Sequence, residues 1–186
     1  MLEFGDKPDI RFRLDEKQIG LEHTRIDPQE YRRGAKLADA QFPERCFSTT
    51  GLHYERELRR DNDDLVETMF NFGEWEEVGI AMERWAKSCA SALMTKTKKM
   101  NHPEFDRFDE NWLLVTGEIG PDNDQVSWNI APRYLFEAIK QAGFCADAAS
   151  GEAQFHRVYF SFDPHLFLHT TQKLVRLAPF PETTPQ

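Results

Sequence analysis

Two carboxylate residues near the N-terminus, Asp9 and Glu22, are the first candidates for chemistry in this 186-residue chain. Each lies in a stretch where polar and apolar residues alternate, which is typical of a β-strand with one apolar face. If the two stretches pair, both carboxylates point to the same side of the sheet and repel each other. Because hard divalent cations prefer carboxylate oxygens, this pattern predicts a metal site at Asp9 and Glu22.

A β-hairpin is the element that must position this pair. Its expected strands are residues 9–14 and 19–26, joined by the polar loop 15–18. One face of the hairpin is apolar, and we expect that face to be the core side. It carries Ile10, Phe12, Leu14, Ile19, Leu21 and His23.

The loop length sets the register of this hairpin. With a four-residue loop, Asp9 lies opposite Thr24 and Arg11 lies opposite Glu22, and paired residues share a face. The two carboxylates are then diagonal neighbours on the polar face. The alternative is a solvent-facing pair in which Arg11 and Glu22 form an ordinary surface ion pair of little energetic consequence.

A lysine stands where an apolar residue is expected on the longest predicted helix, residues 74–100. Helical steps from Trp85 through Cys89 reach Lys96 and continue to Met100. A charged residue on an apolar stripe is unusual, so Lys96 is a candidate for a functional role. The alternative is that its stem packs at the rim of the core while its ammonium group reaches water.

Pro8-Asp9, followed one hairpin later by Glu22-His23-Thr24, resembles the motif of the PD-(D/E)XK nucleases, the restriction-endonuclease-like superfamily. The resemblance implies that Asp9 and Glu22 hold Mg²⁺ or Mn²⁺, helped by the main-chain carbonyl of His23. In that family the metal activates water to attack a phosphodiester and stabilises the leaving oxygen.

The third motif position departs from the family, because Thr24 stands where a lysine is usual. A threonine cannot supply the positive charge that stabilises the pentavalent phosphate. Some branches of the family take this lysine from a following helix, and the passage from Lys96 to the apolar run 112–115 resembles theirs. The resemblance then implies a charge-stabilising role for Lys96. Candidates for contact with substrate phosphates flank the same face or the helix end: Arg11, Arg13 and Lys99.

The rest of the pattern is that of an α/β protein. After the hairpin, predicted helices alternate with strands, including the continuous apolar run 112–115 and a further strand at 155–162. We expect a restriction-endonuclease-like mixed sheet flanked by helices, as one domain over residues 1–178 with a flexible proline-rich tail at 179–186.

Residues from Asp163 onward are expected to form a short helix or turn. On a helix, His165 and His169 share a face and could bind zinc, although ordinary core or surface histidines are the stronger interpretation. The sequence contains no Glu beside His165 of the kind a metalloprotease needs.

The function that the resemblance implies is metal-dependent cleavage of nucleic acid, DNA in preference to RNA, as in restriction or in conflict with phages and mobile elements. A net charge of −9 excludes coating of nucleic acid by bulk charge but not a local basic groove. The alternative is a nuclease-like fold with a lapsed active site that binds a protein partner, which Thr24 and the acidity favour. A third interpretation, a DNA-mimicking inhibitor, is supported by the acidity of the chain alone.

Composition also predicts a compartment. The three cysteines show no CxxC spacing, which fits a reducing setting. The N-terminus lacks the apolar core of a signal peptide, and no stretch approaches the ~18 apolar residues of a membrane span. We therefore expect a cytoplasmic protein without a membrane partner, and the oligomeric state stays open.

Overall fold

The computed structural model describes residues 2–4, 8–27, 29–44, 61–70, 78–117, 125–144, 154–162, 165–170 and 173–177. Within these ranges the chain forms β1 (Leu2–Phe4), β2 (Ile10–Leu14), β3 (Lys17–Arg25), α1 (Gln29–Gln41), α2 (Asn62–Phe70), α3 (Val78–Met100), β4 (Glu110–Thr116), α4 (Gln125–Gln141), β5 (Arg157–Phe162), β6 (His165–Thr170) and β7 (Lys173–Leu177). The expected tail, residues 179–186, lies outside the described residues, and the extent of the single domain stays a prediction.

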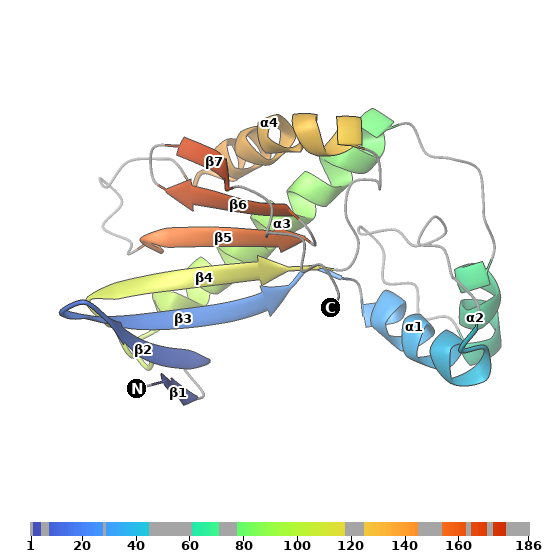
Figure 1. Cartoon of the computed structure of the whole chain (residues 1–186), viewed down its shortest axis with the longest axis horizontal. Helices are drawn as coiled ribbons and strands as arrows, with labels where there is room; N and C mark the ends of the chain where they lie inside the picture. The colour runs from blue at the N-terminus through green and yellow to red at the C-terminus, as the bar shows by residue number, and fades with distance from the viewer. Residues whose placement is uncertain are drawn as a thin grey trace, which may run out of the picture.

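The strands form one mixed sheet in the order of the chain, β1 to β7 (Figure 1). Strands β1, β2 and β3 are antiparallel, β3, β4 and β5 are parallel, and β5, β6 and β7 are antiparallel again. Parallel neighbours need crossover connections, and these carry α3 before β4 and α4 before β5. The expectation of an α/β fold with a helix-flanked mixed sheet and an opening hairpin is confirmed.

The main core lies between one face of the sheet and the packed pair α3 and α4. At its centre the Trp85 ring meets the rings of Trp128 and Phe162 edge-on, with centroids 5.8 and 5.2 Å apart. Cys89 is fully buried on the same stripe of α3, and burial raises the pKa of its thiol. It is therefore the core thiol expected from its position. The strands contribute Leu113, Val115, Val158, Phe160, Phe162 and Phe167.

This core lies on the opposite face of the hairpin from the one expected. Glu22 pairs with Leu113 in the β3–β4 ladder, and paired residues share a face, so Glu22 faces the helices. The apolar face of the hairpin packs on the far side of the sheet, where the Phe12 ring lies 5.6 Å from that of Trp112. The expectation was wrong because alternation identifies which face is apolar, not which face the helices cover.

The hairpin turn is shorter than expected. Leu14 pairs with Lys17, so the turn contains two residues, and Asp15 adopts φ = 55°. Aspartate tolerates this left-handed conformation better than most residues. The shorter turn shifts the pairing by two positions, so Arg11 lies opposite Gly20 rather than Glu22. A shift by an even number leaves every side chain on its expected face.

The chain after Asp163 differs from expectation. Instead of a short helix or turn it forms the antiparallel strands β6 and β7. The pattern of burial along β6 alternates, and His165, Phe167 and His169 face the core. The apolar positions 166 to 168 hid this alternation from the sequence, because both faces of the strand are apolar.

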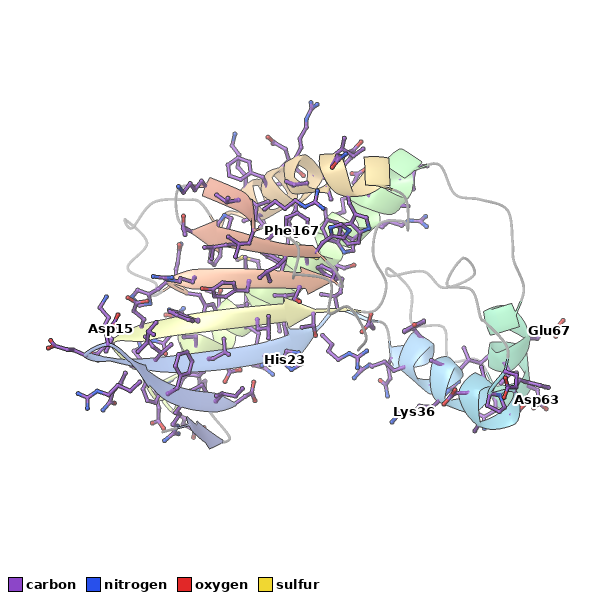
Figure 2. All side chains as sticks on the ribbon, in the orientation of Figure 1. Asp15, His23, Lys36, Asp63, Glu67 and Phe167 are labelled. Atoms are coloured by element: carbon purple, nitrogen blue, oxygen red, sulfur yellow. The ribbon has the colours of Figure 1, made fainter. Side chains whose placement is uncertain are left out.

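Helices α1 and α2 pack against each other beyond the carboxyl end of β3, away from the main core (Figure 1). Helix α2 begins after Asp61, whose Oδ1 atom accepts a 3.0 Å hydrogen bond from the Asp63 main-chain nitrogen. This contact is an N-cap. Figure 2 shows Lys36 on α1 and Asp63 on α2, both far from the hairpin end of the sheet.

Candidate active site

Asp9 and Glu22 adjoin the end of the β2–β3 ladder, whose final pair is Ile10 opposite Leu21. Both residues line one cleft together with Lys96 of α3. The two carboxylates therefore share the helix-facing side of the sheet, as the sequence predicts.

A main-chain contact fixes the Asp9 carboxylate. Its Oδ2 atom accepts a 2.6 Å hydrogen bond from the main-chain nitrogen of His23. In a hydrogen-bonded antiparallel pair a residue directs its N–H and its C=O to the same neighbour, so the His23 carbonyl also points to the Asp9 side. Continued beyond its final pair, the same register would place Pro8 opposite His23, and a proline has no N–H to donate to that carbonyl. In that arrangement no main-chain donor at position 8 competes for the His23 carbonyl.

Gly20 allows Pro8 to lie close to β3. A Cβ atom at Gly20 would lie 2.9 Å from the Pro8 ring and 2.7 Å from the Phe108 ring, both too close for a real contact. Pro8 is buried at this position. The local packing that ends the ladder beside Asp9 therefore depends on a residue without a side chain.

Lys96 reaches the same place from α3. Its Nζ atom donates a 2.6 Å hydrogen bond to Oε2 of Glu22, and the two side chains are only 15% and 8% exposed. The helical stripe that contains Lys96 therefore faces the sheet, as predicted, and its ammonium group is bound to a carboxylate rather than directed to open water. The structure brings together the three candidate catalytic side chains, Asp9, Glu22 and Lys96.

A cleft of about 600 Å³ opens beside these residues. Two of its cationic residues, Lys98 and Lys99, belong to the last turn of α3 and are exposed. Acidic groups inside and ammonium groups at the rim suit a substrate that carries negative charge toward a bound cation. The lining consists of Asp9, Glu22, Lys96, Lys98, Lys99, His102, Glu104 and Phe105.

The candidate phosphate-contacting residues divide into two groups. Lys99 lines the cleft. Arg11 instead binds Asp106, with Nη2 2.9 Å from Oδ2, and its guanidinium lies 5.4 Å from the centre of the Phe108 ring. Arg13 is exposed on the hairpin and does not appear among the described residues of the cleft. The structure thus brings only Lys99 of the three to the cleft.

The His23 side chain lies on the opposite face from Glu22. It is exposed on β3 (Figure 2), and its Nε2 atom lies 2.8 Å from Oγ1 of Thr116 in a hydrogen bond. The His23 imidazole is therefore directed away from the cleft, and the contact of His23 with Asp9 is made by its main-chain nitrogen. The expected placement of this side chain in the core is therefore wrong.

The donor atoms present fit a hard divalent cation. They are carboxylate oxygens of Asp9 and Glu22 and the main-chain oxygen of His23, all of the type that Mg²⁺ and Mn²⁺ prefer. Lys96 occupies Oε2 of Glu22, which leaves Oε1 for a cation. The described residues contain no group of three or more His, Cys, Asp or Glu side chains that could hold a metal.

The two C-terminal histidines are core residues. The His165 ring stacks on Trp128 with centroids 4.2 Å apart, and its Nδ1 atom lies 2.6 Å from Nη2 of Arg176. His169 is 1% exposed, and burial lowers its pKa to about 4. On strand β6 the two histidines share a face but lie four residues apart along an extended chain, not one helical turn apart. The zinc interpretation is therefore not supported.

Sequence reasoning missed a second, basic groove beside the cleft. It has a volume of about 420 Å³ and lies between the end of β3 and the exposed side of α3. A signal was present, because Arg84, Ser88, Ser91, Thr95 and Lys99 follow one another at steps of three or four and therefore form one stripe of the helix. This polar stripe lies next to the apolar stripe that identified the helix.

The chain matches no protein-family model, no curated protein and no solved structure. In the described ranges, no helix is both long and apolar enough to cross a membrane. The geometry of the cleft is therefore the basis for a functional proposal.

Proposed function

We propose that this protein is a metal-dependent nuclease that hydrolyses phosphodiester bonds at the cleft containing Asp9, Glu22 and Lys96. The observation that carries the proposal is the 2.6 Å contact between Lys96 on α3 and Glu22 on β3, beside Asp9. These elements are distant in sequence, and a packed core would not by itself place two carboxylates and an ammonium group at one cleft.

Asp9, Glu22 and the His23 carbonyl would hold the cation. A bound Mg²⁺ or Mn²⁺ supplies a Lewis acid and lowers the pKa of its bound water. The hydrogen bond from the His23 nitrogen fixes the orientation of the Asp9 carboxylate before any ligand arrives. Such preorganisation reduces the reorganisation that binding and reaction require.

Lys96 would replace the lysine that the motif lacks at Thr24. Its ammonium group has three N–H donors, of which one is given to Glu22. The other two can be donated to a phosphate oxygen as negative charge develops there. The pair with Glu22 holds Nζ in position for this role.

We also propose the restriction-endonuclease-like fold as the finer description. Its support is the order of elements: the hairpin β2–β3 carries the acidic residues, α3 follows with the lysine, and β4 returns parallel to β3. This is the order that the resemblance to relocated-lysine members implies.

A cleavage assay with matched variants tests the function. The wild-type protein should cleave supercoiled plasmid, single-stranded DNA or RNA with Mg²⁺ or Mn²⁺, and a chelator should abolish cleavage. Asp9→Asn should lose at least ~10²-fold in rate, as expected for disabling a metal ligand. Asp63→Asn, which changes an exposed carboxylate on α2 (Figure 2), should retain full activity.

Two results would count against the nuclease. One is equal cleavage by Asp9→Asn and Asp63→Asn, which would locate the activity elsewhere. The other is a folded wild-type protein that cleaves none of the three substrates with either metal. That second result would favour the protein-binding module with a lapsed site.

A further inference from the structure

The basic groove between β3 and α3 is the feature of the fold that the proposed cleavage chemistry does not use. We call it the β3–α3 groove; its cationic side chains are Arg25, Arg84, Lys87, Lys96 and Lys99. Among the described residues that line it, none carries a carboxylate. Arg25, Lys87 and Lys96 each pair with a carboxylate outside this lining, namely Asp27, Glu83 and Glu22. In a protein with a net charge of −9, five cationic side chains along one groove still suit an anionic ligand.

The groove is continuous with the cleft. Lys96 and Lys99 line both, one turn of α3 apart. At the other end, Arg25 also lines a pocket of about 660 Å³ along α1, together with Arg32 and Lys36. Cations therefore extend from the cleft along α3 to α1, with Asp39 as the one acidic residue among the described lining of the α1 pocket.

The end of β3 lies beside this track. Among the described residues, strand β2 pairs with β3 only as far as Ile10 opposite Leu21, and β3 continues past that ladder toward α1 (Figure 1). Thr24 faces α3 from this stretch, on the same side of the sheet as Glu22. A ligand that occupies the cleft can therefore continue along β3 without crossing another strand in the part of the chain that the structure describes.

Arg25 is held in place by a buried partner. Its Nε and Nη2 atoms lie 2.9 and 2.7 Å from Oδ2 of Asp27, whose side chain is fully buried. Two donors on one oxygen restrict the guanidinium where the groove meets the α1 pocket. The ion pair of Lys87 with Glu83 is different, because both side chains are more than half exposed and such pairs are weak. A phosphate can therefore replace Glu83 at little cost.

We propose that the β3–α3 groove binds the sugar–phosphate backbone of the nucleic-acid strand that enters the cleft, without reading its bases. The inference rests on the proposed nuclease function and specifies how that site holds its substrate. Cationic groups and the hydroxyls of Thr24, Ser91 and Thr95 are donors suited to phosphate oxygens. The described lining contains no aromatic side chain on which a base could stack, so binding should be independent of sequence.

A binding experiment without divalent metal tests this proposal while the probe stays intact. Fluorescence anisotropy would follow labelled oligo-dT, oligo-U and a mixed-sequence DNA strand. The variant Arg84→Gln/Lys87→Gln should bind all three about tenfold or more weakly than wild type. Its plot of log Kd against log salt concentration should be shallower by about 1.4, the value for two lost phosphate contacts on a single strand. The matched control is Arg133→Gln/Lys140→Gln on α4, which should bind as wild type does.

The outcomes separate this inference from the nuclease proposal. If the wild-type protein cleaves but Arg84→Gln/Lys87→Gln binds with the same affinity and salt dependence as wild type, the groove proposal alone is overturned. Equal losses in the α4 control would show a non-specific charge effect and would also overturn it. So would a tenfold preference for one base. Groove-dependent binding in a protein that cleaves nothing would support the groove and overturn the nuclease.

Discussion

The Nζ atom of Lys96 lies 2.6 Å from Oε2 of Glu22, although the two residues are 74 positions apart in the chain. Both side chains are largely buried, at 15% and 8% exposure. Removal of either member of such a pair destabilises the folded protein, because the remaining charge is buried without its partner.

Lys96→Met should therefore destabilise the protein, by about 1–3 kcal/mol, because the Glu22 carboxylate loses its partner. Sequence alone predicts a neutral or stabilising change, since methionine suits an apolar stripe; the ion pair reverses the sign. The double variant Glu22→Gln/Lys96→Met should regain most of the loss. Urea unfolding of the two single variants and the double variant measures this coupling, and additive effects would show that the pair contributes nothing.

Phe12→Ala should cost about 2–3 kcal/mol, somewhat less than a fully buried aromatic, because Phe12 is only partly buried against Trp112. Arg13→Ala should cost far less, because Arg13 is exposed on the opposite face of the hairpin. Chemical melts of the two variants compare these values. Equal destabilisation would mean that the register of the hairpin is off by one residue.

Pro8→Ala should weaken Mn²⁺ binding by roughly tenfold, the equivalent of one hydrogen bond. Alanine restores an N–H that can bond the His23 carbonyl and so compete with the cation. Hydrogen exchange would show whether the new amide at position 8 is protected. A protected amide combined with unchanged Mn²⁺ affinity would exclude the His23 carbonyl as a ligand.

His169 should make stability fall in mild acid. Burial lowers its pKa from 6.5 to about 4, so between these values the unfolded chain binds a proton that the folded protein does not. The contribution is fully present above the unfolded value and is lost as pH falls from 6.5 toward 4, for a total of about 3 kcal/mol. His169→Leu should flatten that part of the urea-derived stability profile. An identical profile in both proteins would contradict a buried neutral histidine.

The sequence predicted the placement of the candidate site residues better than the placement of the core. The predicted register of the hairpin was wrong, but Asp9 and Glu22 still share a face. The two-residue turn shifts the pairing by an even number of residues, which leaves every side chain on its expected face. Lys96 was identifiable because a charge interrupts a helical stripe. Its partner was not, because nothing local in a sequence states which face of a hairpin a distant helix covers.

The remaining differences have similar causes. His165 and His169 suit one helical face by spacing, yet β6 has apolar residues on both faces and the period-2 signal is lost. Arg25 stands in a strand and Arg84 in a helix, and only tertiary structure places them on one groove. Arg11 was expected near the site by its face, but Asp106 and Phe108, almost a hundred residues away, hold it elsewhere.

The central claim, a divalent cation held by Asp9 and Glu22, is tested most directly by calorimetric titration of Mn²⁺ into wild type and Glu22→Gln. The amide can still accept the hydrogen bond from Lys96, so the variant should stay folded, as circular dichroism would check. We predict weak but saturable binding of one Mn²⁺ to wild type and none to folded Glu22→Gln. Equal affinity in the two proteins, or no binding to wild type, would contradict the account.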